Sequence, residues 1–229
     1  MTLPISETFT SIQGEGALTG VPSHFIRTSG CNLRCTWCDT PYASWSPEST
    51  TRAIDDLVAE ADASGVDHVV VTGGEPMMHD AIVDLCQALG QHVTIETAGT
   101  IHRPPIADLL SISPKLASST PTGDPRDPSG AWATRHESRR LDLGVLRRLI
   151  DEAAEVQVKF VVCDESDLEE IDGLVDALGI GGPHVMLMPE GALPAPGDLQ
   201  RMVARACVSR GWRYSHRVHV DLWGDERGR

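Results

Sequence analysis

Short apolar runs alternate along the chain with segments whose apolar residues recur at helical spacing. The runs predict six strands, at residues 25–27, 69–72, 93–97, 109–113, 156–162 and 185–188. Helical spacing is found at residues 54–61, 82–89 and 143–153, and Thr50-Thr51 is expected to cap the first of these helices. Repeated strand–helix units imply a parallel sheet buried on both faces, either open or closed into a barrel.

Polar residues follow the points where the predicted strands end. They are Arg27, Thr72, Glu75, Glu96, Thr97, Ser113, Lys115 and Glu190. Ligands of open α/β sheets and of barrels bind at the carboxyl ends of the strands. We therefore expect these side chains to share one pocket.

Residues 118–138 interrupt the strand–helix pattern. The segment carries Pro121, Gly123, Pro125, Pro128 and Gly130 and few apolar residues. A long segment without regular structure is usually functional or flexible. We expect a lid, because the segment directly follows the strand that ends at 113, and a flexible loop is the alternative.

Composition narrows the class of protein. The 229 residues are 41% hydrophobic and suffice for a single domain, 1–229, with a substantial core. A formal net charge of −14 disfavours nonspecific binding to nucleic acid or to an anionic membrane. We find neither a long apolar run nor a signal-peptide pattern, so we expect a cytoplasmic protein.

Three cysteines, Cys31, Cys35 and Cys38, follow the first predicted strand with C-x₃-C-x₂-C spacing. Three thiolates can bind three irons of a cubane cluster and leave the fourth iron open to a ligand. In a reducing compartment a cysteine cluster indicates a metal site rather than disulfides. Zinc with a distant histidine is the alternative, although no second cysteine or histidine pair accompanies the triplet. The other cysteines, at 86, 163 and 207, are expected to be small buried hydrophobic residues.

A glycine-rich turn, Thr72-Gly73-Gly74-Glu75-Pro76, follows the second predicted strand. Paired glycines allow a ligand to approach the backbone, where carbonyl groups and the carboxylate can accept from an ammonium group. Taken alone, such a sequence is most often a turn that ends a strand.

The cysteine triplet followed by this turn resembles the radical S-adenosylmethionine (SAM) superfamily. A longer series of motifs resembles, more narrowly, the 7-carboxy-7-deazaguanine synthase family. In order, the motifs lie at residues 13–16, 20–22, 25–27, 38–40, 72–76, 96–100 and 113–115, with weaker similarity at 158–162, 188–191 and His219. The resemblance implies an incomplete (β/α)6 TIM-like barrel of the radical SAM type, with a short N-terminal substrate-binding extension at 1–22.

The implied activity is that of a carbon–nitrogen lyase of deazapurine, or queuosine-type, biosynthesis. It contracts the ring of 6-carboxy-5,6,7,8-tetrahydropterin to give 7-carboxy-7-deazaguanine with loss of ammonia. The implied cofactors are a 4Fe-4S cluster, SAM and Mg²⁺, and the implied electron donor is flavodoxin-like. A homodimer is expected. Two alternatives remain open: another radical SAM enzyme, such as a glycyl-radical activase, and a non-enzymatic zinc or iron–sulfur binding module.

The resemblance also implies roles for individual residues. Cys31, Cys35 and Cys38 would bind the cluster, and Thr40 would bind Mg²⁺, which prefers oxygen ligands. The residues implied to contact SAM are Trp37, Cys38, Asp39, Gly74, Glu75, Ser113, Pro114, Lys115 and Glu190. Those implied to contact the pterin are Ile12, Gln13, Gly14, Glu15, Arg27, Thr72 and His219.

Several of these residues also have a simpler structural explanation. The guanidinium of Arg27 can pair bidentately with the substrate carboxylate, although an arginine at a strand end is often only a surface charge. Lys115 is alternatively a solvated side chain, Glu190 an exposed loop acid and His219 a structural histidine. The chain also runs ten residues beyond His219, where some relatives place a terminal carboxylate in the pocket. Asp221, Asp225 or Glu226 is expected to replace it.

Overall fold

One nine-stranded sheet organises the computed structural model, which describes residues 1–191 and 193–229. The strands lie in the order β3-β1-β2-β4-β5-β6-β7-β8-β9. Their bounds are β1 Thr2–Ile12, β2 Pro22–Thr28, β3 Thr50–Ala53, β4 His68–Gly73, β5 His92–Thr97, β6 Leu109–Ile112, β7 Val156–Val162, β8 Val185–Pro189 and β9 Arg213–Tyr214. Strands β2 and β4 to β9 pair in parallel, whereas β1 pairs antiparallel with β2 and β3. Because β3 and β9 are the two edges, the sheet is open, which confirms the predicted incomplete barrel.

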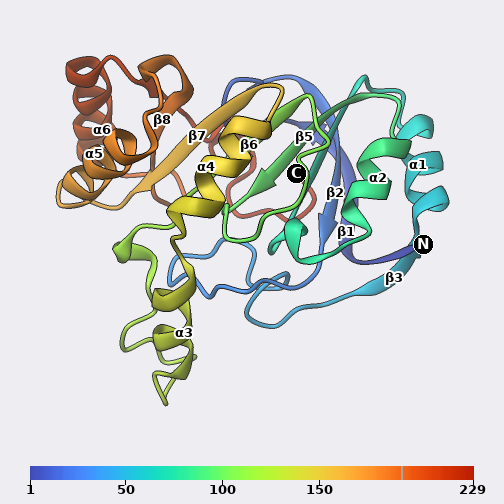
Figure 1. Cartoon of the computed structure of the whole chain (residues 1–229), viewed down its shortest axis with the longest axis horizontal. Helices are drawn as coiled ribbons and strands as arrows, with labels where there is room; N and C mark the ends of the chain where they lie inside the picture. The colour runs from blue at the N-terminus through green and yellow to red at the C-terminus, as the bar shows by residue number, and fades with distance from the viewer. Residues whose placement is uncertain (192) are drawn as a thin grey trace.

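Helices surround the curved sheet, as Figure 1 shows. The α-helices are α1 Ile54–Ala63, α2 Ile82–Ala88, α3 Ala131–Arg139, α4 Leu143–Glu152, α5 Asp167–Leu178, α6 Gly197–Arg210 and α7 Val218–Trp223. Short 3₁₀ turns are η1 Pro76–Met78, η2 Ala117–Ser119 and η3 Gly182–His184. All six predicted strands are present, as β2 and β4 to β8, and the three helical patterns are α1, α2 and α4.

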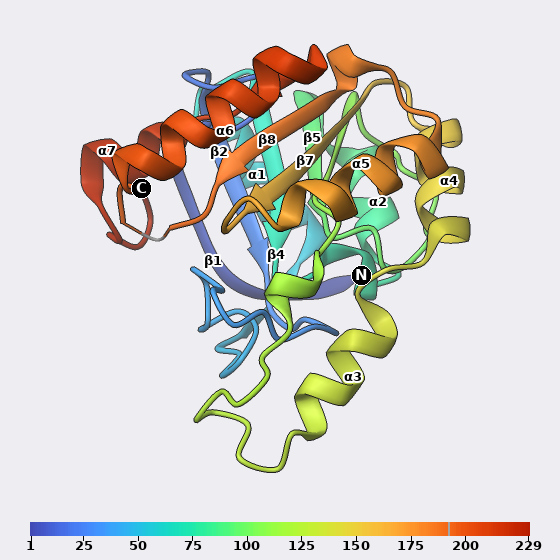
Figure 2. The same cartoon turned by 90° about the vertical axis from the view of Figure 1, so that its left-hand side faces the viewer.

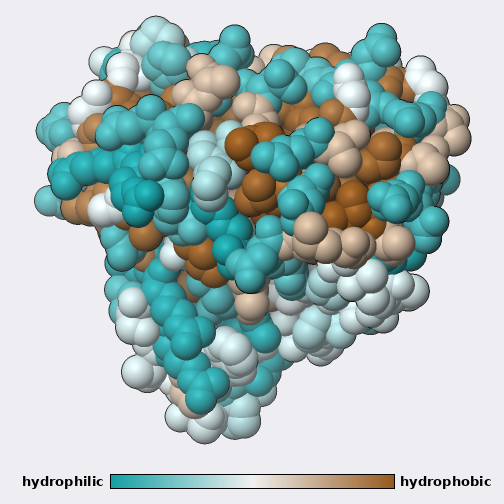
Figure 3. Space-filling model, turned by 45° about the vertical axis from the view of Figure 1, so that its right-hand side comes forward, coloured by the Kyte–Doolittle hydropathy of each residue, from teal (hydrophilic) through white to brown (hydrophobic). Residues whose placement is uncertain are grey.

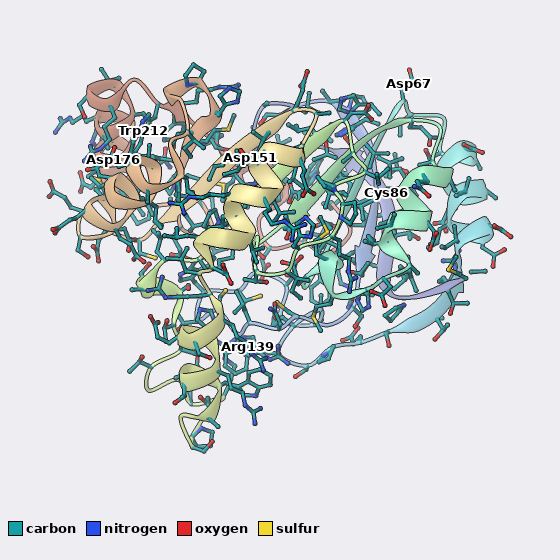
Figure 4. All side chains as sticks on the ribbon, in the orientation of Figure 1. Asp67, Cys86, Arg139, Asp151, Asp176 and Trp212 are labelled. Carbon is teal, nitrogen blue, oxygen red and sulfur yellow. The ribbon has the colours of Figure 1, made fainter. Side chains whose placement is uncertain are left out.

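The core lies between the sheet and the helices. Leu57 of α1, Leu85 of α2 and Leu149 of α4 are fully buried against strand residues such as Val69 and Val71. Each such side chain contributes about 1.5–3 kcal/mol of hydrophobic stabilisation. Cys86, labelled on α2 in Figure 4, is also buried in this layer, as expected. Cys207 is buried too, whereas Cys163 is half-buried. In the described residues, no helix is long and apolar enough to cross a membrane.

The N-terminal extension contains more regular structure than the sequence predicted. Residues 2–12 form β1, whose register pairs Phe9 with Phe25 of β2, and the two rings stack with centroids 4.7 Å apart. The expected helix cap at Thr50-Thr51 is wrong. These threonines begin β3 instead, which pairs with the first half of β1, and Ala53 precedes helix α1.

The expectation that residues 118–138 lack regular structure is confirmed for 120–130 and wrong for the remainder. Their second half is helix α3, which begins at Ala131 and projects beyond the carboxyl ends of the strands (Figure 2). His136 explains why this polar segment folds. Its ring is fully buried, and it is bonded to Ser119 Oγ at 2.8 Å and to the backbone N–H of Arg34 at 3.1 Å. The role of this segment as a lid stays a prediction.

Candidate active site

A cavity of about 270 Å³ lies at the carboxyl ends of the parallel strands. Its walls come from the β1–β2 turn, the cysteine loop after β2, the ends of β4 to β8 and the residues after β9. Every residue predicted for the site lines this cavity except Glu75 and Pro114. The lining members of that set are Ile12, Gln13, Gly14, Glu15, Arg27, Cys31, Cys35, Trp37, Cys38, Asp39, Thr40, Thr72, Gly74, Ser113, Lys115, Glu190 and His219.

The cysteine loop is anchored from within and from outside. Arg34 Nη1 donates to the carbonyl groups of Cys31 and Leu33, both at 2.7 Å. From outside, the backbone N–H of Thr36 donates to Ser119 O at 2.9 Å, and the N–H of Arg34 donates to His136. The guanidinium of Arg34 also lies 4.0 Å from the ring centroid of Trp132 in α3. The segment before and within α3 therefore holds the cysteine loop in place.

The donor set fits an iron–sulfur cluster better than one zinc ion. All six cysteines are free, and Cys31, Cys35 and Cys38 line the same cavity. Across residues 1–191 and 193–229, no three histidine, cysteine or acidic side chains are close enough to hold a single metal ion. A cluster spreads its ligands over several irons and tolerates wider spacing. Trp37 lines the cavity, and its buried Nε1 has no hydrogen-bond partner in the described chain, as expected of a group that meets a ligand.

Burial also changes the pKa of the cysteine thiols. It raises the pKa of the Cys31 thiol to about 12, with a further contribution from the charge of Glu75, and it also raises the pKa of Cys35. Such thiols stay protonated and react slowly, whereas coordination to a metal removes the proton. Ser44 Oγ lies 3.1 Å from Cys38 Sγ, and Thr40 Oγ1 lies 3.8 Å from the same sulfur.

The glycine turn after β4 packs directly against the cysteine loop. Glu75 N donates to Gly30 O at 2.9 Å, and Gly74 N donates to Thr28 O at 3.2 Å. A Cβ on Gly74 would lie 2.2 Å from Gly30 O, and one on Gly73 would lie 2.2 Å from Thr28 Oγ1. Both contacts exclude a side chain, so this close approach explains why two glycines stand here.

Glu75 and Pro114 lie outside the cavity lining. The carboxylate of Glu75 is fully buried and accepts from Thr97 Oγ1 at 2.7 Å, Ala98 N at 2.8 Å and Met77 N at 3.0 Å. Burial raises its pKa, and these hydrogen bonds oppose the rise. The side chain therefore ties the turn after β4 to the end of β5.

Several predicted residues meet at the end of β6. Lys115 Nζ donates to Ser113 Oγ at 2.8 Å and lies 5.6 Å from the ring centroid of Trp37. Lys115 is thus half-buried in the cavity wall rather than free in solvent. Glu190, after β8, is half-buried on the far wall, and burial raises its pKa while Arg217 opposes the rise.

The turn Gln13-Gly14-Glu15 closes one side of the cavity. Gln13 Nε2 donates to Glu96 Oε1 at 3.1 Å, which links the turn to β5. A Cβ on Gly14 would lie 1.9 Å from His219 Nδ1, so only glycine allows the histidine ring to pack there. Burial lowers the pKa of His219, although the charge of Glu15 opposes this, so the ring is neutral near pH 7.

Two basic residues that the sequence analysis did not select hold Glu15. Lys159 of β7 forms an ion pair with Glu15 Oε2 and lies 3.9 Å from Glu96 Oε1. Arg217 Nε donates to Glu15 Oε1 at 2.9 Å, and the same guanidinium pairs with Asp39. Burial opposes ionisation of Glu15, but these cations hold its pKa far below its usual range. The sequence does contain a signal for Lys159, because a lysine inside the apolar run 156–162 is expected to be buried and to need an acidic partner.

Arg27 is also held by a carboxylate. Its Nε donates to Glu7 Oε1 at 2.7 Å, and the hydroxyl of Tyr42 donates to the same oxygen at 2.9 Å.

Of the residues expected to replace the terminal carboxylate of some relatives, Asp225 and Glu226 line the cavity, whereas Asp221 pairs with His216 outside it. Neither Tyr42 nor Arg217 carried a local sequence signal, because each acts through partners that are distant in the chain.

Comparison with known proteins gives consistent matches. The family model of the radical SAM superfamily matches residues 25–165. The 7-carboxy-7-deazaguanine synthase of Halobacterium salinarum is 50% identical, over 97% of this chain and 91% of its own length. That of Rhodopirellula baltica is 50% identical, over 99% of this chain and 88% of its own. The crystal structure of QueE from Escherichia coli superposes with a TM-score of 0.69 and 29% identity, covering 96% of this chain and 95% of that one. The chain belongs to the radical SAM superfamily and, within it, to the 7-carboxy-7-deazaguanine synthase family.

Proposed function

We propose that the protein contracts the ring of 6-carboxy-5,6,7,8-tetrahydropterin to 7-carboxy-7-deazaguanine with loss of ammonia, a step toward deazapurines of the queuosine type. One observation carries the proposal. A single cavity holds the cysteine triplet on one wall and Arg27 with the Gln13-Gly14-Glu15 turn on another. A cluster site and a polar site suited to a small carboxylated heterocycle are therefore adjacent, within a family whose relatives bear this name.

Membership of the radical SAM superfamily implies a 4Fe-4S cluster and SAM. Cys31, Cys35 and Cys38 would hold three irons, which leaves the fourth for SAM. When bound, the cluster supplies one electron to the sulfonium of SAM and so provides the radical that removes hydrogen from the substrate. Gly74, Trp37, Asp39, Ser113, Lys115 and Glu190 line the same cavity and would contact SAM. Glu75 and Pro114 would act by shaping the turns that carry these residues.

The substrate side must bind and orient the pterin. The guanidinium of Arg27 would pair with the substrate carboxylate, because Glu7 occupies only its Nε. Glu15 stays ionised between Lys159 and Arg217 and would accept from ring N–H donors. The walls contributed by Ile12, Gln13, Gly14, Thr72 and His219 would fix the plane of the ring and exclude water.

We also infer a Mg²⁺ site at Thr40. Thr40 lines the cavity, and its hydroxyl lies 3.8 Å from Cys38 Sγ. Mg²⁺ takes oxygen ligands and keeps several waters, so one protein hydroxyl with the substrate carboxylate would suffice. The ion would stabilise negative charge while the ring rearranges.

A flavodoxin-like electron donor, a homodimer and a cytoplasmic location complete the proposal. The three thiols at the cluster site are free, which is consistent with a reducing compartment. A hydrophobic area surrounded by hydrophilic residues, on the face in Figure 3, is compatible with association of two chains. Arg27 and Glu15 favour a small charged substrate over the protein target of a glycyl-radical activase.

Anaerobic turnover tests the proposal. The reconstituted protein is incubated with carboxytetrahydropterin, SAM, dithionite and Mg²⁺, and the products are identified by mass. We expect 7-carboxy-7-deazaguanine together with 5′-deoxyadenosine or regenerated SAM. Replacing Cys31, Cys35 or Cys38 with alanine should abolish both the brown colour of the cluster and SAM cleavage. A colourless wild-type protein that retains one zinc ion would refute the proposal.

A further inference from the structure

Glu7 of β1 is the shared acceptor of three groups that come from different parts of the chain. It accepts from Arg27 Nε at 2.7 Å, from the Tyr42 hydroxyl at 2.9 Å and from Arg227 Nε at 2.9 Å. Its side chain is only 12% exposed. Burial opposes ionisation, but Arg27 and the three hydrogen bonds lower the pKa of Glu7, so it is a carboxylate at neutral pH.

The contact with Glu7 fixes the direction of Arg27. Because Nε is bonded to Glu7, the plane of the guanidinium is restrained, and the end-on edge formed by its two Nη groups is left for another acceptor. Within residues 1–191 and 193–229, no protein acceptor is bonded to either Nη group, and Arg27 lines the cavity. Two parallel N–H groups in one plane are what bidentate binding of a carboxylate requires.

Arg227 links the same carboxylate to Glu48, which lies between β2 and β3. Besides Glu7, it donates through Nη1 to Glu48 Oε2 at 2.9 Å and lies 3.9 Å from the ring centroid of Tyr42. All residues of the segment 224–229 line the cavity. Burial raises the pKa of Tyr42 to about 12, so its hydroxyl stays a donor to Glu7. Arg227 therefore anchors this segment beside Arg27.

We propose that Glu7 is a positioning residue with two effects. It orients the guanidinium of Arg27 to bind the substrate carboxylate. Through Arg227, it holds segment 224–229 against the cavity. The proposal rests on the proposed function, because it takes Arg27 as the group that binds the carboxylate. Substrate binding by Arg27 and closure of the cavity by segment 224–229 are coupled, because Arg27 and Arg227 share the carboxylate of Glu7.

A double-mutant cycle tests the first effect. Binding is measured on the reconstituted enzyme with SAM but without reductant, using carboxytetrahydropterin and the same pterin without its carboxylate. We expect Glu7→Gln to weaken binding of the carboxylated pterin at least tenfold more than that of the other pterin, which loses only the contribution of segment 224–229. In the Arg27→Gln background, Glu7→Gln should weaken binding of the two pterins equally. Additive losses, or equal losses for both pterins in the single Glu7→Gln variant, would overturn the positioning role.

Limited trypsin digestion tests the second effect. Trypsin must take the Arg227 side chain into its own binding pocket, so release of residues 228–229, followed by mass spectrometry, reports detachment of Arg227. We expect Glu7→Gln and Glu48→Gln to accelerate this release several-fold. Asp198→Asn, which removes an exposed acid on α6, is the matched control and should not change it. Unchanged release in Glu7→Gln would overturn the anchoring role.

The two outcomes are separable from the proposed function. A wild-type enzyme that neither binds carboxytetrahydropterin nor forms the product would refute the function and, with it, the role of Glu7 toward Arg27. The trypsin experiment requires no turnover and still decides whether Glu7 anchors segment 224–229.

Discussion

Glu15 shows how charges are balanced in the active site. It lies between Lys159 and Arg217, and these cations also face Glu96 and Asp39 respectively. Removing one residue of such a buried network lowers the free energy of unfolding by about 3–5 kcal/mol, because its partner is left as an unpaired buried charge. Arg27 differs from these cations, since its partner Glu7 has two other donors, Tyr42 and Arg227. Replacing Arg27 therefore does not leave the buried carboxylate of Glu7 without partners.

Replacing Arg27 with glutamine should separate substrate binding from SAM cleavage. Truncating one partner of a buried, hydrogen-bonded charge pair costs about 2–5 kcal/mol, roughly a thirty-fold or greater loss of affinity for the carboxylated pterin. We expect product formation to fail at ordinary substrate concentrations while SAM cleavage without product continues. Both rates are measured from the same anaerobic reaction. Arg52→Gln, which breaks a partly exposed ion pair with Glu60, is the control, and equal loss of both activities in Arg27→Gln would contradict the assignment.

Gly14→Ala should disturb the substrate side by displacing His219. The new Cβ would lie 1.9 Å from His219 Nδ1 and 2.9 Å from His219 Cβ, so rotation of the ring alone does not relieve the clash. Overpacking of this kind costs about 1–3 kcal/mol. We expect lower stability to urea and reduced product formation with normal iron content. The double variant Gly14→Ala/His219→Ala, which removes the ring but keeps the 2.9 Å contact with Cβ of residue 219, should regain part of the stability, and Gly90→Ala, where a Cβ meets nothing within 4 Å, should be neutral.

Strand-end residues were predictable because parallel strands bring their carboxyl ends to one edge. This reasoning placed Thr72, Ser113 and Lys115 in one cavity, as the structure does. It did not show that Glu75 turns into the core, because the direction of a turn side chain depends on Thr97 and Ala98 from the next strand. Contacts between residues about 200 positions apart, such as Arg217 with Glu15, leave no local pattern to detect.

At the scale of elements, the buried parallel strands were clear because they read as continuous apolar runs. Strand β1 was missed because it alternates apolar and polar residues weakly and lies at the antiparallel side of the sheet. Helix α3 was missed because its stability comes from one buried histidine rather than from an apolar face. His136 is fully buried there, while most of its neighbours are exposed.

His136→Ala should loosen the cysteine loop. The substitution removes the acceptor of the Arg34 N–H and the partner of Ser119 Oγ, and it leaves a cavity. The combined cost is about 2–4 kcal/mol. We expect lower stability to urea and faster loss of iron to a chelator than in wild type. Arg139→Ala, on an exposed position of the same helix, is the control. Loss of stability with an unchanged rate of iron loss would show that α3 supports the fold but not the loop.

For the whole molecule, the open sheet explains why segments from both ends of the described chain build the site. A closed barrel would surround its own strand ends, whereas here the β1–β2 turn and the residues after β9 complete the wall. The carbonyl of Gly14 accepts from Val218 N at 3.0 Å, and Gly16 N donates to Ser215 Oγ at 2.9 Å, so these two regions are joined directly. The proposed substrate site is therefore built on contacts that form only when the entire sheet has folded.

Global stability should fall on mild acidification because of buried neutral histidines. His68 is buried between Ser23 Oγ at 2.7 Å and Thr94 Oγ1 at 2.8 Å, and burial, with His92 adding to it, lowers its pKa from 6.5 to about 4. Between pH 6.5 and 4 the unfolded chain binds a proton that the folded chain does not, so the free energy of unfolding falls by about 1.4 kcal/mol per pH unit. The full contribution is present above pH 6.5, and His136, whose pKa burial also lowers to about 4, acts in the same direction.

His68→Gln isolates this effect, because acid damage to the cluster is common to both proteins and cancels in their difference. Glutamine removes the titrating group but can still bond to Ser23 and Thr94. From pH 7.5 to 5, urea unfolding should show wild type losing about 2 kcal/mol more than the variant, because His68 titrates over about 1.5 of these pH units. The rise in the pKa of Glu75 acts in the opposite direction, but it is present in both proteins and does not enter the comparison. Parallel stability curves for the two proteins would mean that His68 is already protonated in the fold, with its charge accommodated by the two hydroxyl groups.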